Sequence, residues 1–180
     1  MVTQDDILKV LGTIDDPEMP ISIVDLGLVE KIEFIQISPD GVAVSIDILP
    51  TFVGCTALPM IENEIRRRVS ALPGVCAVNV AITYAPPWSV DRISTSGRES
   101  LRRHGVSVPQ AGEENAGQPP TCPFCGSTRV RQESAFGPTR CRMIWYCEGC
   151  RHPFEHLKRL ATTGLVNLSL HRIAEHGHGA

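Results

Sequence analysis

The sequence predicts an α/β (α+β) fold in two parts, a small α-β-β-α-β domain and, after a linker, a small cysteine-rich β unit. Three observations support this: the order of apolar patterns over the first 84 residues, a stretch over residues 106–120 that is poor in large apolar side chains, and two Cys-x2-Cys pairs beyond it. We expect the first domain over residues 1–105, the linker over 106–120, the second unit over 121–160 and a tail over 161–180.

The elements of the first domain follow from the periodicity of its apolar residues. Apolar side chains at steps of three or four predict helices, and Val- and Ile-rich stretches with partial alternation predict strands. The expected elements are a helix over residues 3–11, an ordered loop over 15–26, strands over 28–37 and 42–48, a helix over 58–72, a strand over 75–83 and a short helix from 94 or 95 to 105. Turn residues at 38–41 separate the first two strands, so we expect an antiparallel hairpin.

The composition is that of a globular protein rather than a nucleic-acid binder. The chain has 180 residues, of which 42% are hydrophobic and 21% charged, with a formal net charge of -3. Residues 1–105 carry 9 basic and 14 acidic side chains, whereas residues 121–180 carry 8 basic and 4 acidic ones. Because no run of about 18 apolar residues occurs, we expect a cytoplasmic protein that does not enter a membrane.

The clearest chemical signal is the pair of Cys-x2-Cys motifs, which lie 21 residues apart and comprise Cys122, Cys125, Cys147 and Cys150. Such turns aim two thiolates each at one tetrahedral ion, and their crowding does not resemble a secreted disulfide framework. The motifs therefore predict a C-terminal zinc ribbon around one structural zinc ion. Four thiolates leave no open coordination position for catalysis. An iron site of the rubredoxin type uses the same ligands, so zinc and iron both stay open from spacing alone.

The rest of the ribbon supplies strands and a fifth cysteine. The expected strands cover residues 129–134, 140–146 and 153–158. Cys141 would share a strand face with Met143 and Trp145, which favours a packed core thiol over a fifth metal ligand. The ribbon's basic residues do not interleave with aromatic ones, and nucleic-acid binding is disfavoured.

Cys55 is the candidate for reactivity or metal capture in the first domain. It ends the loop that begins at Thr51 and stands just before the long helix, where unpaired amides and the helix dipole favour a thiolate. Asp16, Glu18 and Asp25 in the earlier loop could place a carboxylate beside it. A small cysteine that fills the strand-to-helix corner is the alternative, and spacing does not decide between them.

Several segments, in this order and spacing, resemble the SufT-like iron–sulfur assembly family. They are Asp16 to Pro20, Ile23 to Val29, and Thr51 to Cys55. The segment Ala85 to Asp91, the helix that follows it and the ribbon resemble the branch of that family that accompanies phenylacetyl-CoA epoxidase, and the resemblance reaches about residue 158. The sequence departs from the family pattern at Thr56, where proline is usual, and at Arg92, where an aromatic side chain is expected.

The resemblance implies that Cys55 handles iron or an iron–sulfur cluster transiently, with Asp25 and Thr51 as supports. It implies an accessory or maturation subunit of the epoxidase in phenylacetate catabolism, without a catalytic site of its own. The implied partners are other epoxidase components, especially the iron–sulfur reductase or the di-iron oxygenase. A homodimer stays open.

Other functions also stay open from the sequence. The chain has no Glu-x-x-His pair and no Gly-rich or Walker-type phosphate loop, so it should not itself epoxidise a ring. A thiol enzyme that uses Cys55 as nucleophile lacks a histidine base in the first 103 residues. A rubredoxin-like electron carrier or a zinc-ribbon interaction module is the main alternative.

We expect the histidines of the tail to be solvated; they are His171, His176 and His178.

Overall fold

The computed structural model describes residues 2–39, 41–110, 112 and 118–159. The predicted tail, with its three histidines, lies outside the described residues. Within the described part, no helix is both long enough and apolar enough to cross a membrane. The elements in chain order are α1 Gln4–Leu11, β1 Val29–Ser38, β2 Gly41–Ile48, α2 Leu58–Val69, β3 Val75–Ile82, the 3-10 turn η1 Val90–Arg92, α3 Thr95–Arg103, β4 Val106–Ser107, β5 Val130–Ser134, β6 Arg142–Cys147 and β7 Pro153–Leu157.

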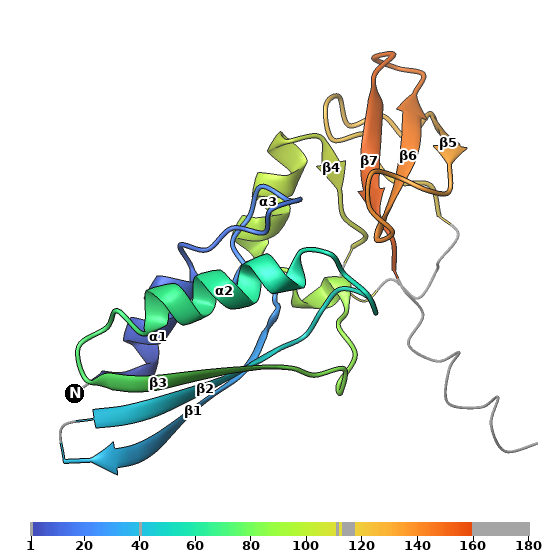
Figure 1. The fold of residues 1–180 in the computed structure, drawn as a ribbon. Helices are drawn as coiled ribbons and strands as arrows, with labels where there is room; N and C mark the ends of the chain where they lie inside the picture. Colours follow the sequence, from blue (N-terminus) through green and yellow to red (C-terminus); the bar gives the residue numbers. More distant parts are fainter. Residues whose placement is uncertain (1, 40, 111, 113–117, 160–180) are drawn as a thin grey trace, which may run out of the picture.

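The first domain is a three-stranded sheet of order β1-β2-β3 with α1 and α2 packed on one face (Figure 1). β1 and β2 pair antiparallel, which confirms the predicted hairpin. β2 and β3 pair parallel, because α2 carries the chain back across the sheet between them. At the start of α1, Thr3 and Asp6 form a capping box, in which each side chain accepts a hydrogen bond from the other's backbone N–H.

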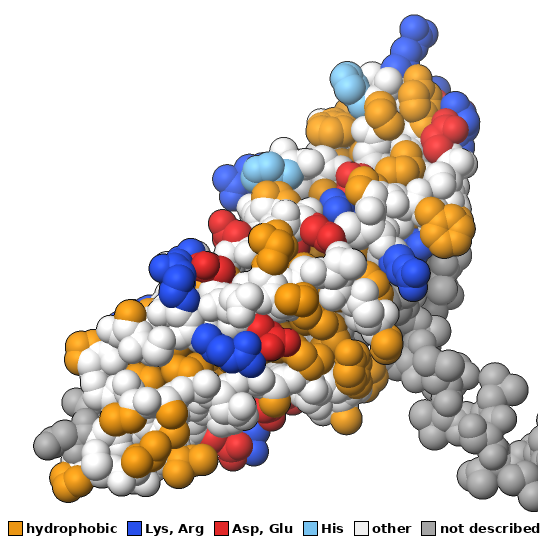
Figure 2. Space-filling view, in the orientation of Figure 1, with side chains coloured by type: hydrophobic (Ala, Val, Ile, Leu, Met, Phe, Trp, Pro, Cys, Tyr) orange, Lys and Arg blue, Asp and Glu red, His pale blue; other side chains and the backbone are white. Residues whose placement is uncertain are grey.

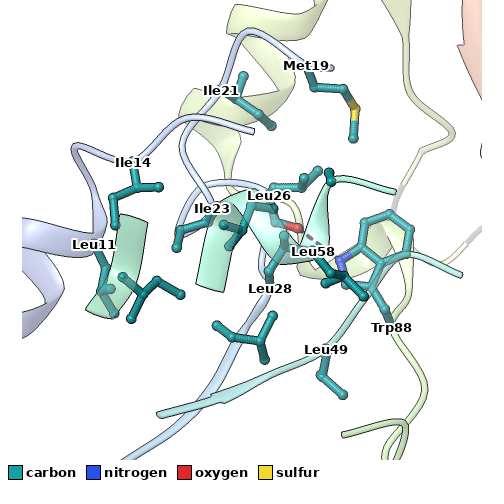
Figure 3. Close-up of a cluster of buried hydrophobic side chains, with 14 of the residues drawn as sticks. Leu11, Ile14, Met19, Ile21, Ile23, Leu26, Leu28, Leu49, Leu58 and Trp88 are labelled. Carbon is teal, nitrogen blue, oxygen red and sulfur yellow. Dashed lines mark hydrogen bonds between the residues drawn. The ribbon is translucent and has the colours of Figure 1, made fainter. Parts of the chain in front are cut away.

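The core of this domain lies between the sheet and the helices, and the ordered loop before β1 contributes much of it. Ile21, Ile23 and Leu26 of that loop are buried, as is Trp88 from the segment after β3. The Trp88 indole Nε1–H donates a hydrogen bond of 3.0 Å to the Leu26 carbonyl oxygen, so the loop and the later segment are joined inside the core (Figure 3). The predicted ordered loop is therefore a packed structural unit.

The second sheet has the order β4-β7-β6-β5, and its three ribbon strands match the predicted ranges to within two residues at each end. The structure differs from the expected linker where that segment begins. Val106–Ser107 form β4, which pairs parallel with β7, and the Glu155 N–H donates to the Gly105 carbonyl. Because Gly105 ends α3 with a positive φ of 79°, the chain turns directly onto the edge of the ribbon.

The ribbon is also packed against the first domain by side chains. The Phe124 ring lies so close to Gly105 that an added Cβ there would stand 2.7 Å from it. Arg102 of α3 donates to the Pro123 carbonyl at 3.2 Å, and Arg159 makes a two-point ion pair with Asp91 at 2.7 and 3.0 Å. Figure 1 shows the ribbon sheet standing beside α3, with the start of β6 and the end of β7 at its lower edge.

Charges of both signs alternate on the surface. On α2, Glu64 pairs with Arg67 and Arg68, and Glu62 pairs with Arg66. On the face drawn in Figure 2, basic side chains lie beside acidic ones rather than gathering into one basic field.

Candidate functional site

The sulfur atoms of Cys122, Cys125, Cys147 and Cys150 all lie within 4.8 Å of one another. Cys122 and Cys150 are 3.7 Å apart between sulfurs, and Cys125 and Cys147 are 3.5 Å apart. A tetrahedral ion with Zn–S bonds of about 2.3 Å separates its sulfurs by roughly 3.8 Å. The donor set and its spacing therefore fit one zinc ion.

The two cysteine turns share one backbone design. The N–H groups of Cys122 and Cys147 donate to the carbonyls five residues later at 3.0 Å, and the residue after each second cysteine donates back to the first cysteine's carbonyl at 3.0 and 2.8 Å. That residue has a positive φ in both turns, 73° at Gly126 and 63° at Arg151. Glycine adopts this conformation without strain and arginine does not.

Backbone amides inside the turns favour bound thiolates. The Cys150 N–H, the Cys125 thiol and the Gly149 N–H, in that order, lower the pKa of the Cys147 thiol to about 6, whereas burial raises the pKa of the Cys150 thiol to about 12. At Cys122 burial raises the pKa, and the N–H groups of Cys125 and Phe124 act against it. A divalent cation at the centre would add to the effect of these amides, because it stabilises every thiolate it touches.

Cys55 lies where the sequence predicts, in the turn just before α2, and is partly buried against the core of the first domain. The N-terminus of α2 has no side-chain cap, and the Ala57 N–H donates to the Cys55 sulfur. The expected lowering of its pKa is nevertheless wrong. Burial raises the pKa of the Cys55 thiol, and the negative charges of Asp16 and Glu18 raise it further, so the amide effect is outweighed.

The ordered loop over residues 15–26 carries Asp16, Glu18 and Asp25, and we refer to it as the acidic loop. It lies beside Cys55. Asp16 is 7% exposed, and its carboxylate accepts the N–H groups of Glu18 and Met19 at 2.8 and 3.0 Å. The Thr56 hydroxyl donates to the Glu18 carboxylate at 3.1 Å. The departure from the family pattern at Thr56 thus gives a direct link between the cysteine turn and the acidic loop, which sequence reasoning missed.

Asp25 has different partners. Its carboxylate accepts hydrogen bonds from Ser94, from Ser96 at 2.7 Å and from Ser22 at 3.1 Å, which lower its pKa. Ser94 is the N-cap of α3, so Asp25 fastens the loop to the start of that helix. Thr51 is buried at the start of the turn that leads to Cys55.

Arg92, the other departure from the family pattern, contacts the chain just after the acidic loop, where β1 begins. Its guanidinium donates to the Gly27 carbonyl at 2.9 Å and pairs with Glu30 at 2.8 Å. A Cβ added at Gly27 would stand 2.6 Å from the Arg92 side chain, so this close approach requires glycine.

Cys141 is a buried core thiol, as predicted, with 3% of its surface exposed. The core to which it belongs is that of the first domain, while Cys122, Cys147 and Phe154 form a separate ribbon core. Periodicity within the ribbon could place Cys141 on a buried face, but it gave no signal that this face meets the other domain.

Comparison with known proteins matches both parts of the chain. Residues 4–80 match the iron–sulfur cluster assembly protein family, and residues 107–158 match the PaaD zinc beta ribbon domain. A protein of Escherichia coli (strain K12) that is named as a component of 1,2-phenylacetyl-CoA epoxidase is 33% identical over 156 residues, which cover 85% of this chain and 91% of that protein.

The first domain alone has further relatives. The Fe-S protein maturation auxiliary factor SufT of Staphylococcus aureus (strain USA300) is 34% identical over 92 residues, which cover 51% of this chain and 97% of that protein. A crystal structure of a domain of unknown function from Bacillus anthracis covers 54% of this chain and 90% of its own, at 25% identity and a TM-score of 0.47.

Proposed function

This chain belongs to the PaaD family of phenylacetyl-CoA epoxidase components, and we propose that it helps to supply iron or an iron–sulfur cluster to another component of that epoxidase. The iron–sulfur assembly relatives of its first domain point to an accessory role of this kind. The clients on this proposal are the iron–sulfur reductase or the di-iron oxygenase, and the setting is the cytoplasm.

The observation that carries the proposal is the position of Cys55. Its sulfur is partly buried at the uncapped start of α2, beside the Asp16 and Glu18 carboxylates. A soft sulfur donor flanked by carboxylates suits an iron ion or cluster that is passed on. Burial raises the pKa of the Cys55 thiol, so the thiol would have to release its proton to bind a metal, and the charge of the bound cation would favour that release.

The other residues have supporting roles on this proposal. Cys122, Cys125, Cys147 and Cys150 hold a structural zinc ion that keeps the ribbon folded, and the ribbon contacts the client. Asp25 acts indirectly by fixing the acidic loop to α3, and Thr51 by filling the base of the cysteine turn. The chain performs no turnover of its own.

The proposal is tested in cells that grow on phenylacetate and lack this gene. They are complemented with the wild type, with Cys55→Ala or with Cys76→Ala, a control at an exposed cysteine on β3. We expect the wild type and the control to restore growth, and Cys55→Ala to leave the isolated epoxidase components deficient in iron. Full iron content and growth with Cys55→Ala, at equal expression, would refute the proposal.

A further inference from the structure

An uncharged surface lies at the end of the first domain where the turn with Cys55 is found. Residues 48–61, which lead from β2 into α2, contain no Asp, Glu, Lys, Arg or His, and neither do residues 69–90, which include β3 and the segment after it. β2 and β3 are parallel, and the Thr83 N–H donates to the Ile48 carbonyl at 2.9 Å just where both strands end. The two uncharged segments therefore leave the sheet at the same end.

Large apolar side chains are exposed on both segments. Val53 before Cys55 is 70% exposed, Met60 in the first turn of α2 is 61% exposed, and Tyr84 after β3 is 50% exposed. The three residues that follow Tyr84 are exposed and apolar as well; they are Ala85, Pro86 and Pro87. Figure 2 shows apolar side chains gathered where α2 begins and β3 ends. A gathering of this kind is typical of a binding surface.

Cys55 belongs to this surface. Phe52 and Cys55 pack against the core of the first domain and fix the turn, whereas Val53 between them stays exposed. Cys55 itself is only partly buried. A protein that takes iron from Cys55 has to bring its own ligands to this turn, and it would cover Val53 in doing so.

The acidic loop places negative charge at the border of this surface. The Thr56 hydroxyl donates to the Glu18 carboxylate at 3.1 Å, which holds Glu18 next to the turn with Cys55. Within the part of the chain that the structure describes, neither Glu18 nor Asp15 of the same loop is in an ion pair, whereas Glu62 on α2 is paired with an arginine. Basic side chains of a partner would complement these carboxylates.

We propose that the uncharged surface formed by residues 50–60 and 83–87 is where the epoxidase component that receives the iron docks, through an apolar patch bordered by Lys or Arg. This inference rests on the proposed function and assigns the surface across which the cargo leaves Cys55. Removal of Val53, Met60 and Tyr84 from water would stabilise the complex whether or not metal is present. Docking should therefore persist without the Cys55 thiol.

The test replaces Val53 of the full chain with a photoreactive phenylalanine analogue, in cells that grow on phenylacetate and lack the native gene. A matched chain carries the analogue in place of Ile37, which is 58% exposed at the opposite end of the sheet. After irradiation, we expect mass spectrometry to find position 53, but not position 37, cross-linked to an epoxidase component. No cross-link from position 53, or one to a second copy of this chain or to its own residues 160–180, would overturn the inference.

The affinity for the cross-linked component, in purified form, tests the same surface. Val53→Asp and Met60→Asp should each weaken binding by about tenfold or more, because each would bury an unpaired charge. Ile37→Asp and Cys55→Ala should bind as the wild type does. Equal affinity in Val53→Asp and Met60→Asp would refute docking here and leave a role of Cys55 intact, whereas full iron transfer by Cys55→Ala would refute the proposed function alone.

The charged border has its own variant. Glu18→Gln keeps an oxygen acceptor for the Thr56 hydroxyl but removes the charge, so binding should become weaker and less dependent on salt. An unchanged salt dependence would contradict a partner with basic side chains at this border. Variants are compared at equal zinc content and thermal midpoint; where these differ from the wild type, the cross-link from position 53 decides.

Discussion

At the scale of single residues, the two cysteine turns carry different residue types at one equivalent position of positive φ. Gly126 and Arg151 occupy equivalent places with φ of 73° and 63°, but arginine in this region costs roughly 1–2 kcal/mol. We expect Arg151→Gly to stabilise the zinc-loaded ribbon by about 1 kcal/mol, and Gly126→Ala to destabilise it by a similar amount. No other atom lies within 4 Å of a Cβ at Gly126, so the second effect is conformational.

The measurement is the free energy of unfolding of the zinc-loaded protein for the two variants and the wild type. Opposite signs are the predicted result. A loss of stability in Arg151→Gly would mean that the Arg151 side chain contributes more than its backbone strain costs.

The site residues show which features a sequence can reveal. The four zinc cysteines were predicted because their spacing within each turn determines their geometry. The neighbours of Cys55 were only partly predicted. Thr56 was noted as a departure without a partner, because its bond to Glu18 joins residues 38 positions apart. The lower pKa expected for Cys55 was wrong because burial is a tertiary property that local helix geometry does not contain.

At the scale of elements, Asp25 joins the acidic loop to α3. Three serine hydroxyls donate to its carboxylate and lower its pKa below the ordinary 3.8. Such a group adds stability above pH 3.8, and this contribution is lost as the pH falls through its lowered pKa. We expect Asp25→Asn to cost about 1–2 kcal/mol at pH 7, since its hydrogen bonds are charge-assisted.

Unfolding by denaturant, followed by circular dichroism at pH 7 and at successively lower pH below 3.8, checks this prediction. The difference between the variant and the wild type should shrink at the acid end. Equal stability at pH 7 would show that the carboxylate does not hold α3 in place.

Local patterns predicted most elements but not their long-range pairing. The helices, the hairpin and the ribbon strands follow from periodicity and turn residues close in sequence. The parallel pairing of β3 with β2 depends on how α2 crosses the sheet. β4 was missed because its two residues pair with Glu155 and His156, nearly fifty positions away, and their neighbours have the composition of a linker.

At the scale of the whole molecule, the two domains have different sources of stability. The first has a continuous apolar core, whereas the ribbon's own core is a small group around two of the zinc cysteines. Structural zinc contributes on the order of 10 kcal/mol or more to such units. We expect a chelator to unfold the ribbon and leave the first domain folded.

One tryptophan in each domain reports on this prediction. Trp145 lies in β6 and Trp88 in the first domain's core. In a Trp88→Phe variant, the emission of Trp145 should shift to longer wavelength after chelation and return when zinc is restored. In a Trp145→Phe variant, the emission of Trp88 should change little; a large shift there would mean that the first domain needs the ribbon to fold.

On the proposed function the chain has two metal sites. The ribbon cysteines bind one structural zinc ion, and Cys55 binds iron that is passed on. The measurement that tests this most directly is zinc and iron per chain after purification without oxygen, for the wild type, Cys55→Ala and Cys122→Ser/Cys125→Ser. We predict one zinc that is lost only in the ribbon variant, and a smaller amount of iron that is lost only with Cys55. One iron per chain on the ribbon cysteines, unaffected by Cys55→Ala, would contradict this account and indicate a rubredoxin-like electron carrier.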